Sequence, residues 1–245
     1  MNKYLGLYNT HSEFNNGASL TRPYVAYCED TGHVHYGPHD PVTNDYPYVD
    51  LGLPSGTLWA TCNVGASSPE QYGDYYAWGE IEPNKASAYT LQNYRFYPGN
   101  DDDEYSKYNS TDNKMTLELA DDAAHVIMGG EWHMPTSAQY AELLDNTTSS
   151  WTTDYNGTGV AGMIFTSKNN ENSIFFPAAG VVVDKGSIGQ GEWFDVWSSS
   201  RNSNSWYAWY MYVNFEGCDL GDDGIRYGGL SVRGVIGEEY ITPIE

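Results

Sequence analysis

The residues that most often carry out chemistry are few in this chain and lie far apart. The three cysteines, Cys28, Cys62 and Cys218, form no C-x-x-C pair and are odd in number, which argues against a set of disulfides or a cysteine-ligated metal. His125 and His133 lie near predicted helices, where a lone histidine is more often structural than a ligand, and no third metal ligand accompanies them. Neither a nucleophile–base motif nor a phosphate-binding loop is found. The sequence therefore predicts a protein that is not an enzyme and that holds no cofactor or metal.

A different kind of chemistry is concentrated toward the C-terminus, where residues 207–219 read YAWYMYVNFEGCD. Side chains alternate between the two faces of a strand, so one face should carry Tyr210, Tyr212 and Asn214. We expect the opposite face to be buried, together with two neighbouring apolar residues; the predicted buried set is Trp197, Trp209, Met211, Val213, Phe215 and Val232. Tyrosine offers contact area at low entropic cost, which suits a recognition surface.

The composition of the chain limits the classes of partner that it is expected to bind. Of 245 residues, 22 are Tyr and 8 are Trp, and 33 acidic against 11 basic residues give a net charge of -22. Nucleic acids and anionic membrane surfaces both require basic patches, so neither is an expected partner. No stretch approaches the roughly 20 apolar residues of a membrane span, and the N-terminus lacks the apolar core of a signal peptide.

The elements that must position the tyrosines form an α+β pattern. Residues 1–46 are predicted to be a β-rich appendage with a hairpin within 22–38, which either attaches the chain to something larger or adds strands to the main domain. The main domain is expected over residues 47–245. Two helices are predicted, over residues 117–128 and after the N-cap Thr136. Short, mostly antiparallel strands are predicted over 162–167, 173–183, 193–199, 208–215 and 230–235, and surface loops over 85–114 and 217–228.

Several segments, taken in order, resemble a known group of proteins. They are DLGLPSGTLWATCNVG (50–65), YGDYYAWGE (72–80), GGEWHMPTSAQYAELL (129–144), FFPAAG (175–180), WSSS (197–200) and GLSVRGV (229–235). Together they resemble bacterial and phage proteins with a C-type lectin fold of the formylglycine-generating-enzyme type. Within that group the chain is most similar to the variable proteins diversified by diversity-generating retroelements. The resemblance implies a C-type-lectin-type fold with a variable segment at about 193–228.

The genetic code offers a test of this resemblance. Such diversification replaces adenines in a template, and Asn codons of the type AAC or AAT then yield Tyr, Asp, Gly, Ser or Cys but never Trp, Met or Glu. Trp209 and Met211 fall on the predicted buried face, whereas Tyr210 and Tyr212 fall on the other, and Glu216 would be a fixed, exposed residue at the strand end. The expected ligand-binding residues are Asp195, Arg201, Ser205, Tyr207, Tyr210, Tyr212, Asn214, Asp219, Asp222, Asp223 and Tyr227.

The resemblance implies a receptor-recognition protein on a phage tail or a bacterial cell surface, with a protein or carbohydrate ligand on a host or target cell. Formylglycine-generating enzymes depend on a pair of active-site cysteines, and here the cysteines lie far apart in sequence, which argues against copper binding and oxidase activity. Two alternatives stay open: an enzyme or metal-dependent carbohydrate-binding protein on the same fold, and a structural tail or adhesin component attached through residues 1–46.

Overall fold

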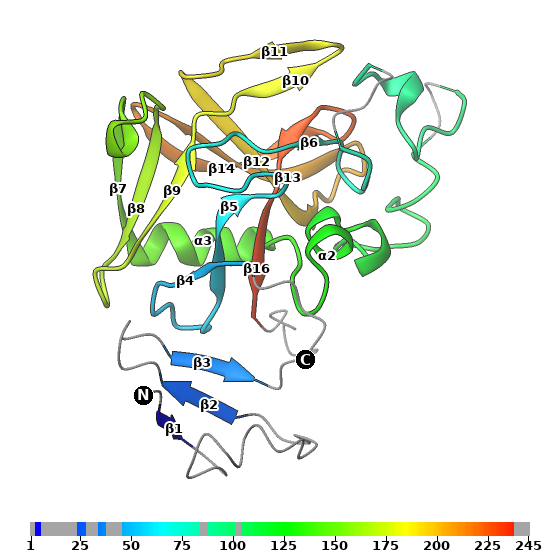
Figure 1. Ribbon diagram of the computed structural model, residues 1–245. Coiled ribbons are helices and arrows are strands. Elements are labelled where there is room, and N and C mark those ends of the chain that lie inside the picture. Colours follow the sequence, from blue (N-terminus) through cyan, green and yellow to red (C-terminus); the bar gives the residue numbers. More distant parts are fainter. Residues whose placement is uncertain are drawn as a thin grey trace. The chain divides into compact units, whose positions relative to one another are not determined.

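Figure 1 shows a computed structural model of the chain, which describes residues 46–83, 88–100 and 104–237 and the backbone of three earlier strands. The chain divides into two compact units, Met1–Asn44 and Asp45–Glu245. The first unit contains an antiparallel sheet in the order β1-β2-β3, formed by β1 (Lys3–Leu5), β2 (Tyr24–Tyr27) and β3 (Val34–Gly37). The hairpin predicted within residues 22–38 is confirmed as β2 and β3.

The largest sheet of the second unit has five strands in the order β14-β13-β12-β15-β6. They are β6 (Tyr75–Tyr76), β12 (Trp193–Arg201), β13 (Tyr207–Asn214), β14 (Gly217–Ile225) and β15 (Leu230–Ser231). Neighbours are antiparallel except β12 and β15, which are parallel. The prediction of a loop over 217–228 is wrong for most of its length, because pairing with β13 holds this Gly- and Asp-rich segment extended despite its low strand propensity.

Three smaller sheets complete the second unit, and all of their strand pairs are antiparallel. The first, in the order β16-β5-β4, consists of β4 (Tyr48–Asp50), β5 (Leu58–Asn63) and β16 (Arg233–Ile236). The second, β7-β8-β9, consists of β7 (Thr147–Thr152), β8 (Gly162–Ser167) and β9 (Ser173–Pro177). The third is the ribbon of β10 (Val181–Val183) and β11 (Gly186–Ile188).

The described residues contain two α-helices, α2 (Ala123–Met128) and α3 (Ser137–Asn146). The predicted N-cap of α3 is confirmed, since Thr136 and Gln139 form a reciprocal capping box. The helix predicted over 117–128 is shorter than expected. Asp122 has an extended backbone and caps α2 by accepting the backbone N–H of His125. Three short 3-10 helices are η1 (Leu91–Asn93), η2 (Leu119–Asp121) and η3 (Tyr155–Gly157).

The predicted class, α+β with two helices and mostly antiparallel short strands, is confirmed for the described residues. In Figure 1, α3 runs along one side of the large sheet and contacts β12, β13 and β14, while the β10–β11 ribbon lies on the other side. The core between these layers is rich in aromatic rings, with Trp59, Trp78 and Trp197 fully buried. The large sheet thus has one face committed to packing against α3.

Candidate binding surface

The inner face of β12, β13 and β14 is apolar and buried. Phe194 and Val196 on β12 pair with Val213 and Met211 on β13, and these four side chains are at most 1% exposed. This face packs toward α3. Of the residues predicted to be buried, Trp197, Met211, Val213 and Val232 are confirmed.

The outer face of the same strands presents polar and aromatic side chains in paired rows. Tyr212 lies opposite Asp195 on β12 and opposite Asp219 on β14. Tyr210 lies opposite Trp197 and Gly221 in the next row. Tyr212 is 36% exposed and Asp219 is exposed, whereas Tyr210 is half-buried. The predicted split of β13 into an apolar face and a face bearing Tyr210, Tyr212 and Asn214 is therefore present from residue 210 onward.

A β-bulge interrupts this alternation. Ala208 pairs with Gly224 and Tyr210 with Gly221, so Trp209 alone stands opposite both Asp222 and Asp223. Ala208 is completely buried and Trp209 is half-buried, so the regular alternation of β13 begins only at residue 210. The prediction that Trp209 is buried is therefore wrong. The apolar–polar pattern of the β13 sequence gives no sign of an extra residue in its neighbour β14.

Two glycines on β14, Gly221 and Gly224, leave room for the Tyr210 ring. A Cβ at Gly221 would lie 2.3 Å from the Tyr210 ring, and a Cβ at Gly224 would lie 2.9 Å from it. The ring therefore lies flat against the β14 backbone, where any larger residue would collide with it. From this position the Tyr210 hydroxyl donates to Asp223 Oδ1 at 3.1 Å. Burial and the nearby carboxylates of Asp195 and Asp223 raise the pKa of Tyr210.

Asp195 is the most perturbed acid on the outer face. Burial, reinforced by the negative charge of Asp223, raises the pKa of the Asp195 carboxyl from 3.8 to about 7. Its Oδ1 is shielded from solvent and accepts no hydrogen bond among the described residues. The outer face therefore holds one carboxyl that is partly protonated at neutral pH, beside two tyrosines and a second, exposed carboxylate.

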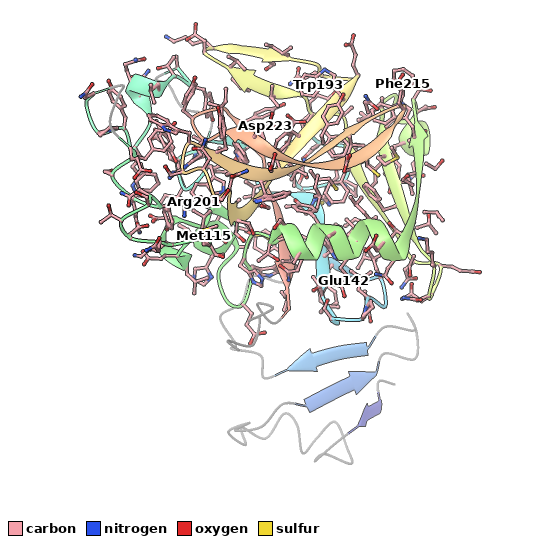
Figure 2. The ribbon with its side chains drawn as sticks, turned by 180° about the vertical axis from the view of Figure 1, so that it is seen from behind. Met115, Glu142, Trp193, Arg201, Phe215 and Asp223 are labelled. Atoms are coloured by element: carbon pink, nitrogen blue, oxygen red, sulfur yellow. The ribbon has the colours of Figure 1, made fainter. Side chains whose placement is uncertain are left out.

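The β13–β14 hairpin ends in a two-residue turn, Phe215–Glu216, because Asn214 pairs directly with Gly217. Asn214 Oδ1 accepts the backbone N–H groups of Glu216 and Gly217, and its Nδ2 donates to the Tyr212 hydroxyl. Phe215 is 70% exposed, so the prediction that it is buried is wrong: the turn begins before it and carries it beyond the sheet. Figure 2 shows Phe215 and Trp193 at the same end of the sheet.

Two residues expected to contact a ligand are inside the protein instead. Arg201 is 4% exposed, and its Nε donates to the carbonyl of Lys114 while its guanidinium contacts Met115 Sδ. Ser205, also 4% exposed, donates to Glu104. Both are covered because the segment 104–115 folds over this end of the sheet, and Figure 2 shows Met115 beside Arg201. Sequence reasoning misplaced them because their covering partners lie 86 to 101 residues away.

The other expected residues divide by exposure. Asp222 and Asp223 are exposed at the bulge, and the Asp222 carbonyl accepts from Asn202 Nδ2. Tyr207 and Tyr227 are half-buried, and Tyr227 packs against the core. The outer face that the structure brings together therefore comprises Asp195, Tyr210, Tyr212, Asn214, Asp219, Asp222 and Asp223.

A buried arginine that sequence reasoning missed holds the covering segment in place. Arg226 is fully buried, and its guanidinium donates to the Tyr94 hydroxyl and to the carbonyls of Lys107, Tyr108 and Ser205. Five aromatic rings surround this guanidinium within 5.9 Å, those of Trp78, Tyr94, Phe96, Tyr105 and Tyr108. A Tyr- and Trp-rich composition was the only signal for this cage.

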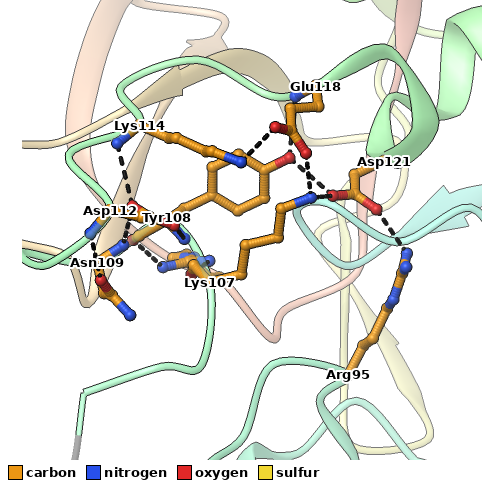
Figure 3. A network of polar contacts seen from close by, with 9 residues as sticks. Arg95, Lys107, Tyr108, Asn109, Asp112, Lys114, Glu118 and Asp121 are labelled. Carbon is orange, nitrogen blue, oxygen red and sulfur yellow. Dashed lines mark hydrogen bonds and ion pairs between the residues drawn. The ribbon is translucent and has the colours of Figure 1, made fainter.

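A charged network on the same segment strengthens its attachment (Figure 3). The carboxylate of Asp121, whose side chain is 1% exposed, accepts from Arg95 at 2.8 Å, from Lys107 at 2.5 Å and from the Tyr108 hydroxyl at 2.7 Å. Glu118 pairs with both Lys107 and Lys114. Burial opposes ionisation of Asp121, but its cationic and hydrogen-bonding partners prevail and lower its pKa. This network is structural and lies apart from the outer face.

No group of three or more residues able to hold a metal ion occurs among the described residues. Within the same residues, no helix is both long and apolar enough to cross a membrane. No protein-family model, curated protein or solved structure matches this chain.

Proposed function

We propose that this chain is a hypervariable ligand-binding protein, not an enzyme, and that it displays a diversified surface on the outer face of β12, β13 and β14. In this proposal the α+β unit is a C-type-lectin-type domain of the kind found in retroelement-diversified bacterial and phage proteins. The protein would act on a phage tail or a bacterial cell surface and recognise a protein or carbohydrate on a host or target cell.

One observation supports this proposal above others: the division of β13 between residues that such diversification reaches and residues that it does not. Met211, which an Asn codon cannot become by changing adenines alone, is fully buried. Tyr210, Tyr212 and Asn214, which are reachable or unchanged, lie on the outer face. Glu216 is not reachable, and as expected for a fixed residue at the strand end it is exposed in the turn. Trp209 is not reachable either, and it is half-buried.

The physical character of the outer face also fits recognition. Rigid aromatic side chains supply contact area with little entropy to lose, and small polar residues adapt their hydrogen bonds to the ligand. Tyr210 is fixed over Gly221 and Gly224, and Tyr212 is tied to Asn214 at 2.8 Å. Two preorganised tyrosines therefore stand among acidic side chains, an arrangement that favours binding without a large ordering cost.

Replacing Tyr210 and Tyr212 together by Ser tests the proposal. The double variant should lose binding to a ligand identified by screening wild type against host-cell surface proteins and glycans. Its free energy of unfolding should fall by no more than about 1–2 kcal/mol, because Tyr212 is exposed and Tyr210 is only partly buried against the core. Binding would be measured by surface plasmon resonance and stability by urea denaturation.

The control is Val126→Ser on α2, which alters an exposed apolar residue (45%) that lies away from the sheet. Val126→Ser should keep full affinity. A Tyr210/Tyr212 variant that folds and also keeps full affinity would place the binding site elsewhere and contradict the proposal. In the genome, a nearby copy of the 3′ coding sequence that differs only opposite adenines would establish the diversification itself.

A further inference from the structure

An apolar edge runs along one end of the outer face and is formed by Ile188, Trp193, Tyr212 and Phe215. The Trp193 ring lies directly over Gly189, since a Cβ there would be 2.1 Å from the ring, and Gly189 follows Ile188 in the chain. The Trp193 and Tyr212 ring centroids are 6.3 Å apart. Three members are well exposed: Ile188 by 52%, Tyr212 by 36% and Phe215 by 70%. These contacts connect the β10–β11 ribbon to Tyr212 on β13, and Phe215 lies at the same end of the sheet as Trp193 (Figure 2).

The hairpin presents Phe215 at a fixed position. Asn214 Oδ1 accepts the backbone N–H groups of Glu216 at 2.8 Å and Gly217 at 3.1 Å, and Asn214 Nδ2 donates to the Tyr212 hydroxyl. An exposed phenyl ring gains nothing from solvent, whereas insertion into a partner would bury it in full. Aromatic residues held rigidly at the centre of an interface carry much of the binding energy in protein complexes.

The surroundings of the edge are acidic. Between residues 186 and 225 the chain has six Asp and Glu residues and one basic residue, Arg201. Arg201 is 4% exposed and does not reach the surface. Glu192, Glu216 and Asp219 are exposed beside Trp193, Phe215 and Tyr212. A partner that covers this edge must therefore present positive charge around an apolar centre.

The form of the edge favours a protein over a carbohydrate. Ile188 and Phe215 offer no side-chain hydrogen bond to sugar hydroxyls, and small ligands bind in concave sites. Two hollows of the described part of the chain lie away from the edge, one lined by residues such as Ala60 and Met128 and the other by residues such as His125 and His133. A projecting turn instead fits into a recess of a larger partner.

We propose that this apolar edge anchors an interface with a protein whose facing surface is basic and carries an apolar recess for Phe215. The inference rests on the proposed function and narrows its ligand to a protein. Phe215 inserts into the partner, and Trp193 and Tyr212 make the flanking contacts. The acidic rim consists of Glu192, Glu216 and Asp219. Because rim charges act mainly through long-range attraction, association should slow as salt concentration rises.

The test uses a displayed library of single-domain binders with random loops, selected against the full wild-type chain. Most independently selected families should be rich in Arg and Lys and should lose at least about tenfold in affinity on Phe215→Ser. Ile225→Ser, which alters another exposed apolar residue (48%), should leave those affinities unchanged. Phe215→Ser should keep the wild-type melting midpoint; Phe215→Gln is the second variant if it does not.

Families that bind without regard to Phe215, or that show no excess of basic residues, would overturn this inference. A glycan panel separates it from the proposed function. A glycan bound by wild type and by Phe215→Ser, but not by the Tyr210/Tyr212 double variant, would overturn the inference and leave the binding function standing. Binding that is unaffected by Phe215→Ser and by the Tyr210/Tyr212 double variant would contradict both this inference and the proposed function.

Discussion

At the scale of single residues, ionisation of the Asp195 carboxyl should lower the free energy of unfolding by an amount that can be measured. Its folded pKa of about 7 lies above the value of about 3.9 expected in the unfolded chain. Well below pH 4 the carboxyl is protonated in both states and does not affect stability. As pH rises toward 7, the unfolded state ionises while the folded state keeps its proton, so ionisation favours unfolding and the loss is complete above pH 7.

Asp195→Asn should therefore stabilise the protein at alkaline pH and not at acidic pH. Each pKa unit corresponds to about 1.4 kcal/mol, so the gain at pH 8 should reach up to about 4 kcal/mol and fall to about 0.5 kcal/mol at pH 4. Urea denaturation at pH 4, 6 and 8 measures it. Asp219→Asn, on the exposed part of the same row, serves as the control and should show little change. A gain that is equal at all three pH values would contradict the explanation.

Arg226 should be far less replaceable than a surface arginine. Arg226→Lys keeps the charge but cannot supply the planar set of donors that reaches Tyr94, Lys107, Tyr108 and Ser205. We expect it to lower the free energy of unfolding by about 3 kcal/mol or more. Arg95→Lys is the matched comparison, because Arg95 is 50% exposed in its ion pair with Asp121, and it should cost less than about 1 kcal/mol. Equal losses in denaturant melts would show that the aromatic cage contributes little.

At the scale of elements, the end of β13 distinguishes Met211 from Phe215, two apolar residues that the sequence pattern assigns to the same buried face. Met211→Ala should cost about 2–5 kcal/mol because Met211 is fully buried. Phe215→Ala should change stability by no more than about 0.5 kcal/mol because the turn leaves Phe215 exposed. Guanidinium melts of the two variants, compared at equal protein concentration, measure the difference. A large loss from Phe215→Ala would mean that the hairpin tip packs against the protein in solution.

Local chemistry made some elements predictable from the sequence and left others hidden. Thr136 was recognised as an N-cap because the capping box lies within four residues, and β8 was recognised over Gly162–Ser167 by its own composition. β14 was missed because its pairing with β13, not its Gly and Asp residues, makes it a strand. The bulge at Asp222 and Asp223 was missed for the same reason.

The candidate surface shows the same limit. Alternation along β13 correctly placed Tyr210, Tyr212 and Asn214 opposite Met211 and Val213, since strand parity is a local property. The positions of Arg201 and Ser205 depend on residues 104–115, which reach the sheet only through the folded chain. Segments that are distant in sequence cover some residues of a predicted surface. The periodicity of the strands themselves cannot predict which residues these are.

At the scale of the whole molecule, the division into two units predicts that the second folds by itself. The hydrophobic core of the described residues is drawn from positions 51–235, with partly buried neighbours from Tyr46 to Ile236. A fragment that spans residues 45–245 keeps all of these positions and every strand from β4 onward. We expect its melting midpoint to lie within about 4 °C of the full chain, a change of roughly 1 kcal/mol or less for a unit of this size.

A second truncation makes the result interpretable. A fragment over residues 51–245 also removes β4, whose residues Tyr48, Val49 and Asp50 pair with Ala60, Trp59 and Leu58 on β5. It exposes an edge of the sheet beside the buried Trp59 and should melt well below the longer fragment or aggregate through the open strand. Near-UV circular dichroism, which reports the packing of Trp59, Trp78 and Trp197, should match the full chain for residues 45–245 only. If both fragments lose this signal alike, residues 1–44 are needed for the fold of the second unit, and the two units are not independent.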